Sequence, residues 1–480
     1  AVPKDGLQAM EYTLSAACGK YQDALRQTVP VLSTRTLVTR SVSLFNNGNE
    51  TRSFSFDELR QPLSAQAADE RLVLEYSSTP MWYAIQCLPT LIKTDDPSSL
   101  RLAHSILGSA SARDILRRNP DVRSMVAGWA AQPAGEWQSR LERNGDLTAS
   151  LVENTPWYLQ SQNEKDRLRN LGKALDEELV AGQLDAAVSK LTAMHIDGAG
   201  WPWMDGMPSD VHITISILEC LGRLQENGAL TLDNRLRSAV NSALAWLDAH
   251  FAKECESVEK PQSVGALEMS YLLAVRRFDS FQYTGRRDDV HRFYMNLAAA
   301  QDTRNLSLME RAQLALVLVK TDAGQAEHVV QTMLERSVLE DEMGRYWKDN
   351  KSGYRWQDAP VEAQSLAIEA LLATGHAAEA SECSRWLLKQ RQTSDWGTSP
   401  ATAHAVVALL AAGEGPVQMA PDITVSLGQR SFKAADNSSY GYMKVELPGR
   451  APASAADIKV QSQSDGISWG AVYYQYSGNL

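Results

Sequence analysis

Both ends of the chain carry the alternating pattern of β-strands, whereas the long middle carries the pattern of helices. In the first strand-like run, residues 35–45, alternation places Val38, Val42 and Leu44 on one face. The other strand-like runs are residues 51–56, 71–76, 423–427, 442–447, 458–461 and 469–476. The runs at each end are too short to form a stable sandwich of their own. The sequence therefore predicts one β-domain assembled from both flanks, with the helical segment inserted in it.

The helical middle, residues 79–412, contains a loose internal repeat. Three of its segments share one layout, in which an aromatic turn with a glycine precedes an Ala/Leu-rich helix. These turns are residues 200–203, 353–356 and 395–397. In the last two segments a proline stands just before or inside the helix and a glycine follows its end, which is the usual asymmetry of helix boundaries.

The helices of this middle segment are of two kinds. Residues 264–275 and 306–319 are apolar nearly all round, which is typical of a helix buried on every side. The more amphipathic stretches are residues 236–251, 289–300, 326–337 and 377–388. Two concentric rings produce this alternation, because inner helices contact only protein while outer helices face water. The pattern predicts a mainly α fold containing an α/α toroid; a straight helical solenoid, with repeats more regular in length, is the alternative.

Charge and composition exclude several classes of function. The 480 residues include 47 basic and 58 acidic side chains, so the formal net charge is −11 and the sequence pI is near 5.4. No cluster of Lys and Arg stands out, so we expect neither nucleic acid nor membrane as a partner. No run approaches the roughly 18 apolar residues that span a bilayer. Residues 1–5 lack the apolar segment of a signal peptide, so we expect a cytoplasmic protein or an internal piece of a longer exported one.

The cysteines and histidines carry no signature of a metal site or a nucleophile. Five cysteines stand singly along the chain without a Cys-x-x-Cys pair: Cys18, Cys87, Cys220, Cys255 and Cys383. We expect buried free thiols rather than a disulfide framework. His195 and His212 bracket the turn at residues 200–203, but no HxxxH or HExxH spacing supports metal binding, and no GxSxG elbow is present. The sequence predicts neither a metal nor a cofactor.

Several short stretches, in order along the chain, resemble the bacterial alpha-2-macroglobulin family. They are residues 30–32 (PVL), 37–39 (LVT), 74–76 (LEY), 82–89 (WYAIQCLP), 153–157 (ENTPW), 200–203 (GWPW) and 469–476 (WGAVYYQY). The resemblance implies that residues 77–417 form an α/α toroid of the thioester-domain type, inserted in a CUB-like β-sandwich domain made of residues 35–76 and 418–480. Residues 1–34 would be the last strands of a preceding macroglobulin-like domain.

The central chemistry of that family requires a Cys-x-Glu-Gln loop, in which the Gln side chain acylates the Cys sulfur to give a strained thioester. Counting on from Pro89, Ser98 falls at the Cys position, Leu100 at the Glu position and Arg101 at the Gln position. Neither serine nor arginine can form the thioester, and no Cys-x-x-Gln occurs anywhere in the chain.

The resemblance therefore implies a non-catalytic fragment of an endopeptidase inhibitor. We expect it to trap proteases or bind other envelope proteins without covalent capture, in the periplasm or cell envelope, as part of a longer exported or lipid-anchored protein.

A toroid enzyme acting on glycans is the alternative, because α/α toroids also host glycosidases and lyases. Inverting glycosidases hold two carboxylates about 6.5–9.5 Å apart across a cleft. Residues that could gather as a binding surface at one mouth of the toroid are Trp201, Trp203, Asp205, Asp210, Trp347, Trp356, Asp358 and Glu362. We favour a structural interpretation of these residues, in which the carboxylates oppose helix dipoles and the tryptophans wedge between the two rings.

The content of the ring centre separates these hypotheses. A centre filled by side chains such as those of Leu267, Leu314 and Ala367 favours the macroglobulin interpretation, whereas a deep cavity with facing carboxylates favours an enzyme. A purely structural module that only packs against neighbouring domains is the third hypothesis.

Overall fold

The computed structural model describes most of the chain. The described residues are 9–30, 35–61, 68–78, 81–93, 98–131, 170–257, 259–340, 343–355, 358–391, 395–413, 423–433, 442–463 and 467–479. The ENTPW stretch at residues 153–157 and Trp356 lie outside the described residues.

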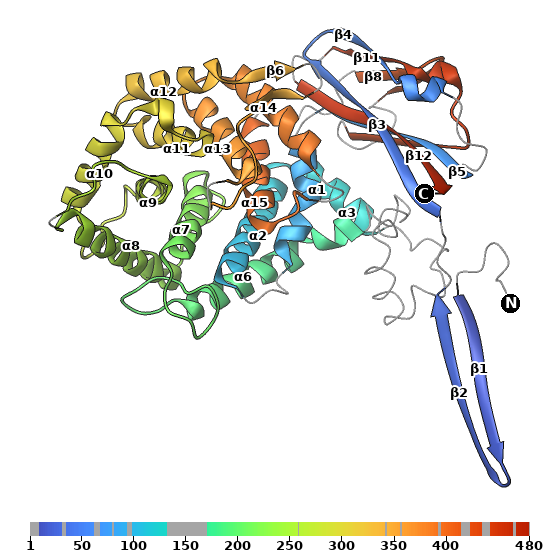
Figure 1. Cartoon of the computed structure of the whole chain (residues 1–480), viewed down its shortest axis with the longest axis horizontal. Helices are drawn as coiled ribbons and strands as arrows, with labels where there is room; N and C mark the ends of the chain where they lie inside the picture. Colours follow the sequence, from blue (N-terminus) through green and yellow to red (C-terminus); the bar gives the residue numbers. More distant parts are fainter. Residues whose placement is uncertain are drawn as a thin grey trace.

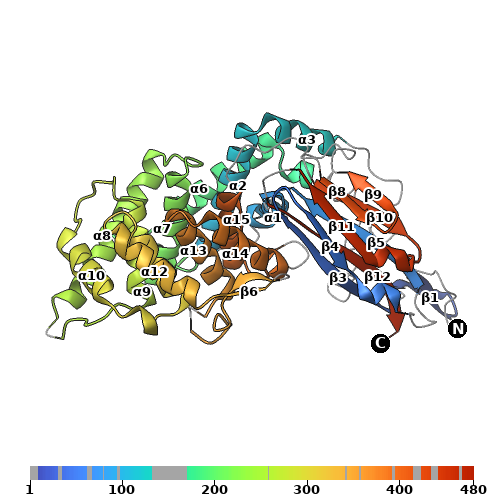
Figure 2. The ribbon, with the colours of Figure 1, turned by 90° about the horizontal axis from the view of Figure 1, so that it is seen from above.

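Two four-stranded antiparallel sheets combine strands from the two ends of the chain (Figures 1 and 2). The first sheet has the order β10 (Tyr442–Pro448), β5 (Ala68–Ser77), β12 (Ile467–Asn479) and β3 (Arg35–Asn47). The second has the order β4 (Thr51–Ser55), β11 (Asp457–Ser462), β8 (Ile423–Leu427) and β9 (Arg430–Lys433). In each sheet, strands that precede the helices pair directly with strands that follow them.

The two sheets share one hydrophobic core. Leu74 and Val472 lie opposite each other on β5 and β12 and are fully buried. Val425 and Val460, from the second sheet, belong to the same buried cluster. Along β11 buried and exposed residues alternate strictly, as expected for a strand with one face on a core and one in water.

Within the described ranges, six helices between β5 and β8 form a closed ring (Figure 1). In ring order they are α2 (Ser99–Arg118), α7 (Val211–Glu226), α9 (Ala266–Arg277), α11 (Leu308–Leu318), α13 (Pro360–Ala373) and α15 (Ser399–Ala412). Each packs against the next, and α15 packs against α2. Six others pack on their outside: α1 (Met81–Ile92), α6 (Glu177–Met194), α8 (Asn234–Cys255), α10 (Asp288–Ala300), α12 (Ala323–Glu335) and α14 (Ala377–Gln390). A further helix, α3 (Pro120–Ala130), follows α2.

Inner and outer helices differ in how much of their surface is buried. On α7 nearly every residue from Ile213 to Leu224 is buried, so this helix has protein on all sides. On α10 the buried residues are Val290, Tyr294 and Ala298, which are four apart and define a single stripe. The two kinds of helix distinguished in the sequence are therefore found in the inner and outer positions.

Two hairpins lie outside the two four-stranded sheets. One is β6 (Val338–Glu340) with β7 (Gly344–Tyr346). The other, β1 (Ala9–Cys18) with β2 (Tyr21–Pro30), extends away from both sheets and from the helices (Figure 1). Leu14 and Leu25 lie opposite each other on the two strands, and each residue is about 60% exposed. A two-stranded hairpin with such exposed apolar residues is marginal by itself in water.

None of the helices in the described ranges is both long enough and apolar enough to cross a bilayer. In the same ranges no group of three or more His, Cys, Asp and Glu is arranged to hold a metal ion.

Candidate functional site

The junction between α1 and α2 is held by the residues that stand at the thioester positions of the sequence resemblance. Ser98 is buried and caps α2, because its hydroxyl accepts a hydrogen bond from the backbone N–H of Arg101 at 3.3 Å. The Arg101 guanidinium donates to the carbonyl oxygens of Leu91, at 2.9 Å, and Thr90. Both carbonyls lie in the last turn of α1, so Arg101 ties the start of α2 to the end of α1.

The loop between α6 and α7 lies against the same helix start. The backbone N–H of Ser99 donates to the carbonyl oxygen of Trp203 at 3.0 Å. The ring of Trp203 is 45% exposed, and Ile196, Met204 and Met207 of the same loop are exposed too. The loop therefore presents an apolar surface beside the N-terminus of α2.

The other predicted surface tryptophans have a different role. Trp201 and Trp347 are at most 2% exposed. The indole N–H of Trp201 donates to the backbone carbonyl of Leu191 at 2.9 Å, and that of Trp347 donates to the backbone carbonyl of Met333 at 2.8 Å. Those carbonyls belong to the outer helices α6 and α12. Both rings are thus wedged between helices and offer no face to a sugar.

The predicted acidic residues are dispersed. Asp210 is the N-cap of α7 and accepts from the N–H of Ile213 at 2.9 Å. Asp358 is paired with Arg355 at 3.2 Å. Asp205 is exposed on the loop before α7. Glu362, in the first turn of α13, lines the interior of the ring, and burial raises the pKa of its carboxyl group.

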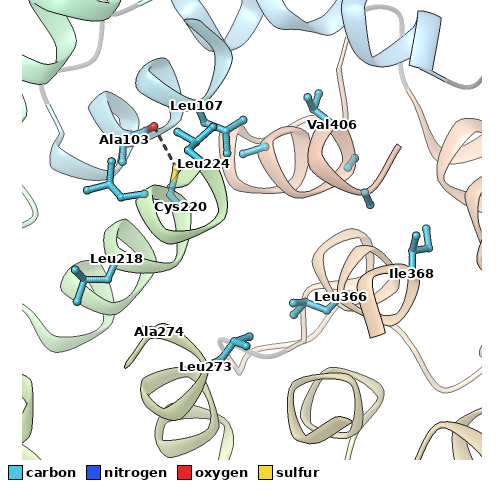
Figure 3. Packing of buried hydrophobic residues seen from close by; sticks show 14 of the residues in the cluster. Ala103, Leu107, Leu218, Cys220, Leu224, Leu273, Ala274, Leu366, Ile368 and Val406 are labelled. Atoms are coloured by element: carbon cyan, nitrogen blue, oxygen red, sulfur yellow. Dashed lines mark hydrogen bonds between the residues drawn. The ribbon is translucent and has the colours of Figure 1, made fainter. Parts of the chain in front are cut away.

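A cavity of about 360 Å³ lies inside the ring, at the end where the six inner helices begin. Every ring helix contributes side chains to its wall from its first turns. Leu107 of α2 and Leu366 of α13 are two of the apolar wall residues, and Figure 3 shows them on separate helices around the interior. Leu314 and Ala367 are buried, as expected for a filled centre, but Leu267 is half-exposed and lines the cavity. The ring is therefore hollow at the end where the inner helices begin.

Four polar side chains of the cavity wall have a buried atom without a hydrogen-bond partner among the described residues. Three of these atoms are acceptors, Oε1 of Glu219, Oε1 of Gln313 and Nδ1 of His404, and the fourth is Nη2 of Arg223, which lies in an ion pair with Glu369. Glu219 is 8% exposed and Gln313 is 2% exposed. The Gln313 amide nitrogen donates to the hydroxyl of Ser270 at 2.8 Å, which leaves its oxygen available. Buried polar atoms without partners are rare in folded proteins and need an explanation.

An ion-pair network lies beside the cavity. Arg223 contacts Glu369 at 3.0 Å, Arg277 contacts the same carboxylate at 3.0 Å, and Arg277 also contacts Glu226 at 2.6 Å. Burial would raise the pKa of Glu369, but the two guanidinium groups outweigh it and hold that pKa below its ordinary value. At Glu219 burial dominates and raises the pKa, although Arg223 and Arg277 oppose the shift.

Two of the histidines that line the cavity, His104 and His404, are held neutral. Burial lowers the pKa of His104 to about 3, and the charges of Arg101 and Arg223 add to the effect. Burial, again with Arg223, lowers the pKa of His404 well below its ordinary value. His104 is hydrogen-bonded through Nδ1 to the hydroxyl of Ser399, which links α2 to α15.

The comparisons with known proteins give matches among solved structures. No protein-family model matches the sequence, and no curated protein sequence matches it significantly. Native alpha-2-macroglobulin from Escherichia coli, from domain MG7 to the C-terminus, is 13% identical with a TM-score of 0.48, covering 98% of this chain and 62% of that chain. Salmonella alpha-2-macroglobulin reacted with methylamine is 12% identical with a TM-score of 0.47, covering 98% of this chain and 26% of that chain.

The chain resembles bacterial alpha-2-macroglobulin over nearly its whole length. It spans less than two thirds of the length of the native Escherichia coli chain in that comparison. The described part of this chain is largely helical and also contains several antiparallel sheets.

Sequence reasoning did not single out Glu219, Gln313 and His404 as site residues. Each interrupts a helix that is otherwise apolar nearly all round, in the segments ISILECLG, RAQLALVL and TAHAVVALL. A polar residue in the middle of a fully buried helix is the signal that could have marked them, since such a residue must find a partner or face a cavity.

Proposed function

We propose that this chain is a non-catalytic part of a bacterial alpha-2-macroglobulin-like endopeptidase inhibitor, which binds proteins of the cell envelope, proteases among them, without covalent capture. The helical ring, residues 77–417, would be the thioester-type α/α toroid. Residues 35–76 and 418–480 would be the CUB-like domain that carries it, and residues 1–34 the end of a preceding macroglobulin-like domain. The insertion of the closed ring between strands of one two-sheet core supports this division.

The observation that carries the proposal is the chemistry at the start of α2. Ser98 and Arg101 occupy the positions of the thioester Cys and Gln in the sequence resemblance; Ser98 caps α2, and Arg101 ties the start of α2 to the end of α1. Burial raises the pKa of Cys220 to about 12 and also raises that of Cys383, so these thiols stay protonated and unreactive. The junction thus keeps a structural role while the acylating group is gone.

The exposed surfaces support a role in contacts with other protein. The apolar loop around Trp203 and the exposed Leu14–Leu25 pair of the β1–β2 hairpin are apolar groups in water. In a longer chain, the hairpin would be completed by further strands of the same domain, which would cover this pair.

Two measurements on the whole 480-residue chain test the proposal. Methylamine opens thioesters, so intact-mass spectrometry before and after methylamine should show no change of mass; an adduct would contradict non-covalent capture. Inactivated serine proteases, such as trypsin or elastase with the catalytic serine blocked, should co-elute with the chain in gel filtration. Failure of every tested protease to bind would overturn the inhibitor role.

A glycan-processing enzyme is the second candidate, favoured by carboxyl groups such as those of Glu219 and Glu362 in the wall of an open cavity. In the described part of the chain, however, no Trp, Tyr or Phe lines this cavity, and sugar rings usually stack on such residues. Release of reducing ends from envelope polysaccharides, lost in the Glu219→Gln variant, would establish this alternative in place of the first.

A further inference from the structure

The three unpaired acceptor atoms of the cavity wall come from alternate helices of the ring. Glu219 lies on α7, Gln313 on α11 and His404 on α15, which are the second, fourth and sixth helices in ring order. These side chains therefore enter the cavity from three directions around the ring. A carboxylate oxygen and an amide oxygen accept hydrogen bonds, and a neutral imidazole offers one acceptor nitrogen. The wall is thus equipped for a group that donates several hydrogen bonds.

The charges facing the cavity favour a cation. Three carboxyl groups line it, those of Glu219, Glu268 and Glu362, whereas the cationic side chain in the lining is that of Arg223. The positive charge of Arg223 is already matched by Glu369, which contacts it at 3.0 Å. A positive group between these carboxylates would also relieve the cost of burying them.

The helix N-termini around the cavity do not provide an anion site. Free N–H groups at a helix start attract anions. Here Ser98, Asp210, Ser307 and Thr398 cap α2, α7, α11 and α15, and the Glu268 side chain accepts from the N–H of Gly265 at the start of α9. The sixth helix, α13, begins with Pro360, which has no N–H. One N–H group at five of the six helix starts therefore already has a side-chain acceptor, and the sixth start has a proline in place of an N–H donor.

The remaining wall is apolar and the mouth is open. Leu100, Ile215 and Met309 add hydrocarbon surface to that of Leu107 and Leu366. Residues at the rim, such as His212 and Leu267, are exposed or half-exposed, so the cavity is accessible from solvent. Its volume of about 360 Å³ falls at the lower end of the range of small-molecule sites.

We propose that this cavity binds a primary ammonium group carried on an aliphatic stem, with Glu219, Gln313 and His404 accepting its three N–H donors and the leucine-lined wall enclosing the stem. An ammonium group has three donors and no acceptor, which matches this set of partners. Both a free aliphatic amine and a lysine side chain have this chemistry. Binding is non-covalent, and it does not depend on the inhibitor role proposed above.

Calorimetry and thermal unfolding of the whole chain at pH 7 test the site with probes of equal length. Pentylamine carries the ammonium group, pentan-1-ol is its neutral analogue, and pentanoate is its anionic analogue. We expect pentylamine to bind at least about tenfold more tightly than the alcohol, because hydrogen bonds to charged groups are the stronger ones. It should also raise the Tm, since it binds the folded state. Pentanoate should not bind.

The source of the ammonium group is decided by a second pair of probes. Nα-acetyl-lysine N-methylamide presents the group as a protein lysine does, and it is compared with pentylamine. Tighter binding of the lysine derivative identifies a partner protein as the source, and tighter binding of pentylamine identifies a free amine.

Two substitutions assign the effect to the cavity. Glu219→Gln keeps the shape of the side chain but removes its charge, and it should weaken pentylamine at least about tenfold. Gln313→Leu removes a second acceptor and should weaken it several-fold. The control is Glu335→Gln, at the exposed end of the outer helix α12, which should bind as the wild type does. The Tm of each variant without ligand shows whether it is folded.

The proposal is overturned if pentan-1-ol binds as tightly as pentylamine, if pentanoate binds more tightly, or if no probe raises the Tm of the wild type. It is also overturned if folded Glu219→Gln protein retains wild-type affinity, or if Glu335→Gln weakens binding equally.

Discussion

Arg223 of α7 and Glu369 of α13 form an ion pair of 3.0 Å across the helical ring, with both side chains at least nine-tenths buried. The two helices are not neighbours in ring order. Arg277 of α9 contacts the same carboxylate, so one acidic group joins three inner helices. The network replaces part of the apolar packing that would otherwise fill the ring beside the cavity.

Replacing Glu369 by Gln should destabilise the chain by about 3–5 kcal/mol, because it removes the ion-pair partner of the buried Arg223 and leaves Arg277 with Glu226 alone. Urea unfolding followed by circular dichroism measures the change. Glu335→Gln, which removes an exposed carboxylate, is the matched control and should change the free energy of unfolding by less than about 0.5 kcal/mol. A loss below about 1 kcal/mol for Glu369→Gln would show that the pair does not hold the ring together.

Asp248 of α8 should be one of the most sensitive polar positions among the outer helices. Its buried carboxylate accepts four hydrogen bonds, from the hydroxyls of Tyr271 and Tyr283, the N–H of Arg287 and Nε2 of His291, at 2.7–2.9 Å. Asp248→Asn presents an NH₂ group to some of these donors, so we expect a loss of at least about 2 kcal/mol. Tyr283→Phe removes one bond and should cost about 1 kcal/mol in the same urea titration. Equal losses for the two variants would contradict the four-bond account.

The Asp248 carboxyl should also contribute to acid sensitivity. Burial raises its pKa, but the hydrogen bonds from His291 and Tyr271 outweigh this and leave the pKa below its ordinary value. A depressed carboxyl pKa stabilises the fold above the unfolded-state value near 4, and that contribution is lost as the pH falls through the folded-state pKa. Unfolding free energies measured between pH 6 and pH 3 should therefore converge for the wild type and Asp248→Asn.

His104 should make the free energy of unfolding decrease at a higher pH than the Asp248 carboxyl does. The folded state holds it neutral with a pKa of about 3, whereas an unfolded histidine titrates near 6.5. Its contribution is therefore present above about pH 6.5 and is lost as the pH falls below that value, by up to about 1.4 kcal/mol per pH unit. The stability curve of His104→Asn should be flatter between pH 6.5 and 4. His328→Asn, on the exposed face of α12, should keep the wild-type slope; a wild-type slope for His104→Asn would contradict the prediction.

Gly470 on β12 is required by the close approach of β5. A Cβ at this position would collide with the carbonyl oxygen of Glu75 and the ring of Tyr76, which is the residue paired with Gly470. Gly470→Ala should therefore destabilise the β-domain by about 1–3 kcal/mol. Gly182→Ala, on the outer helix α6 with open space around it, should instead stabilise the chain by about 0.5–1 kcal/mol. Thermal unfolding measures the Tm of both variants. A change of the Tm in the same direction for both would refute the steric account.

The sequence by itself determined the local structure of this protein. Alternation marked the strands at both ends, and the contrast between all-round apolar and amphipathic helices marked inner and outer positions, because these periods follow from the backbone geometry of each element. The lack of a Cys-x-x-Gln also needed no structure, since a thioester requires those atoms.

The tertiary structure alone decided what faces the ring interior. Trp201 and Trp347 lie in or beside turns, where a surface position would be expected. Both are instead wedged between helices, because an indole N–H in the interior can reach a backbone carbonyl of the neighbouring helix. Glu219, Gln313 and His404 are separated by about 90 residues each along the chain and share a cavity through the closure of the ring. Such convergence depends on how helices distant in sequence pack together, which periodicity within one helix does not encode.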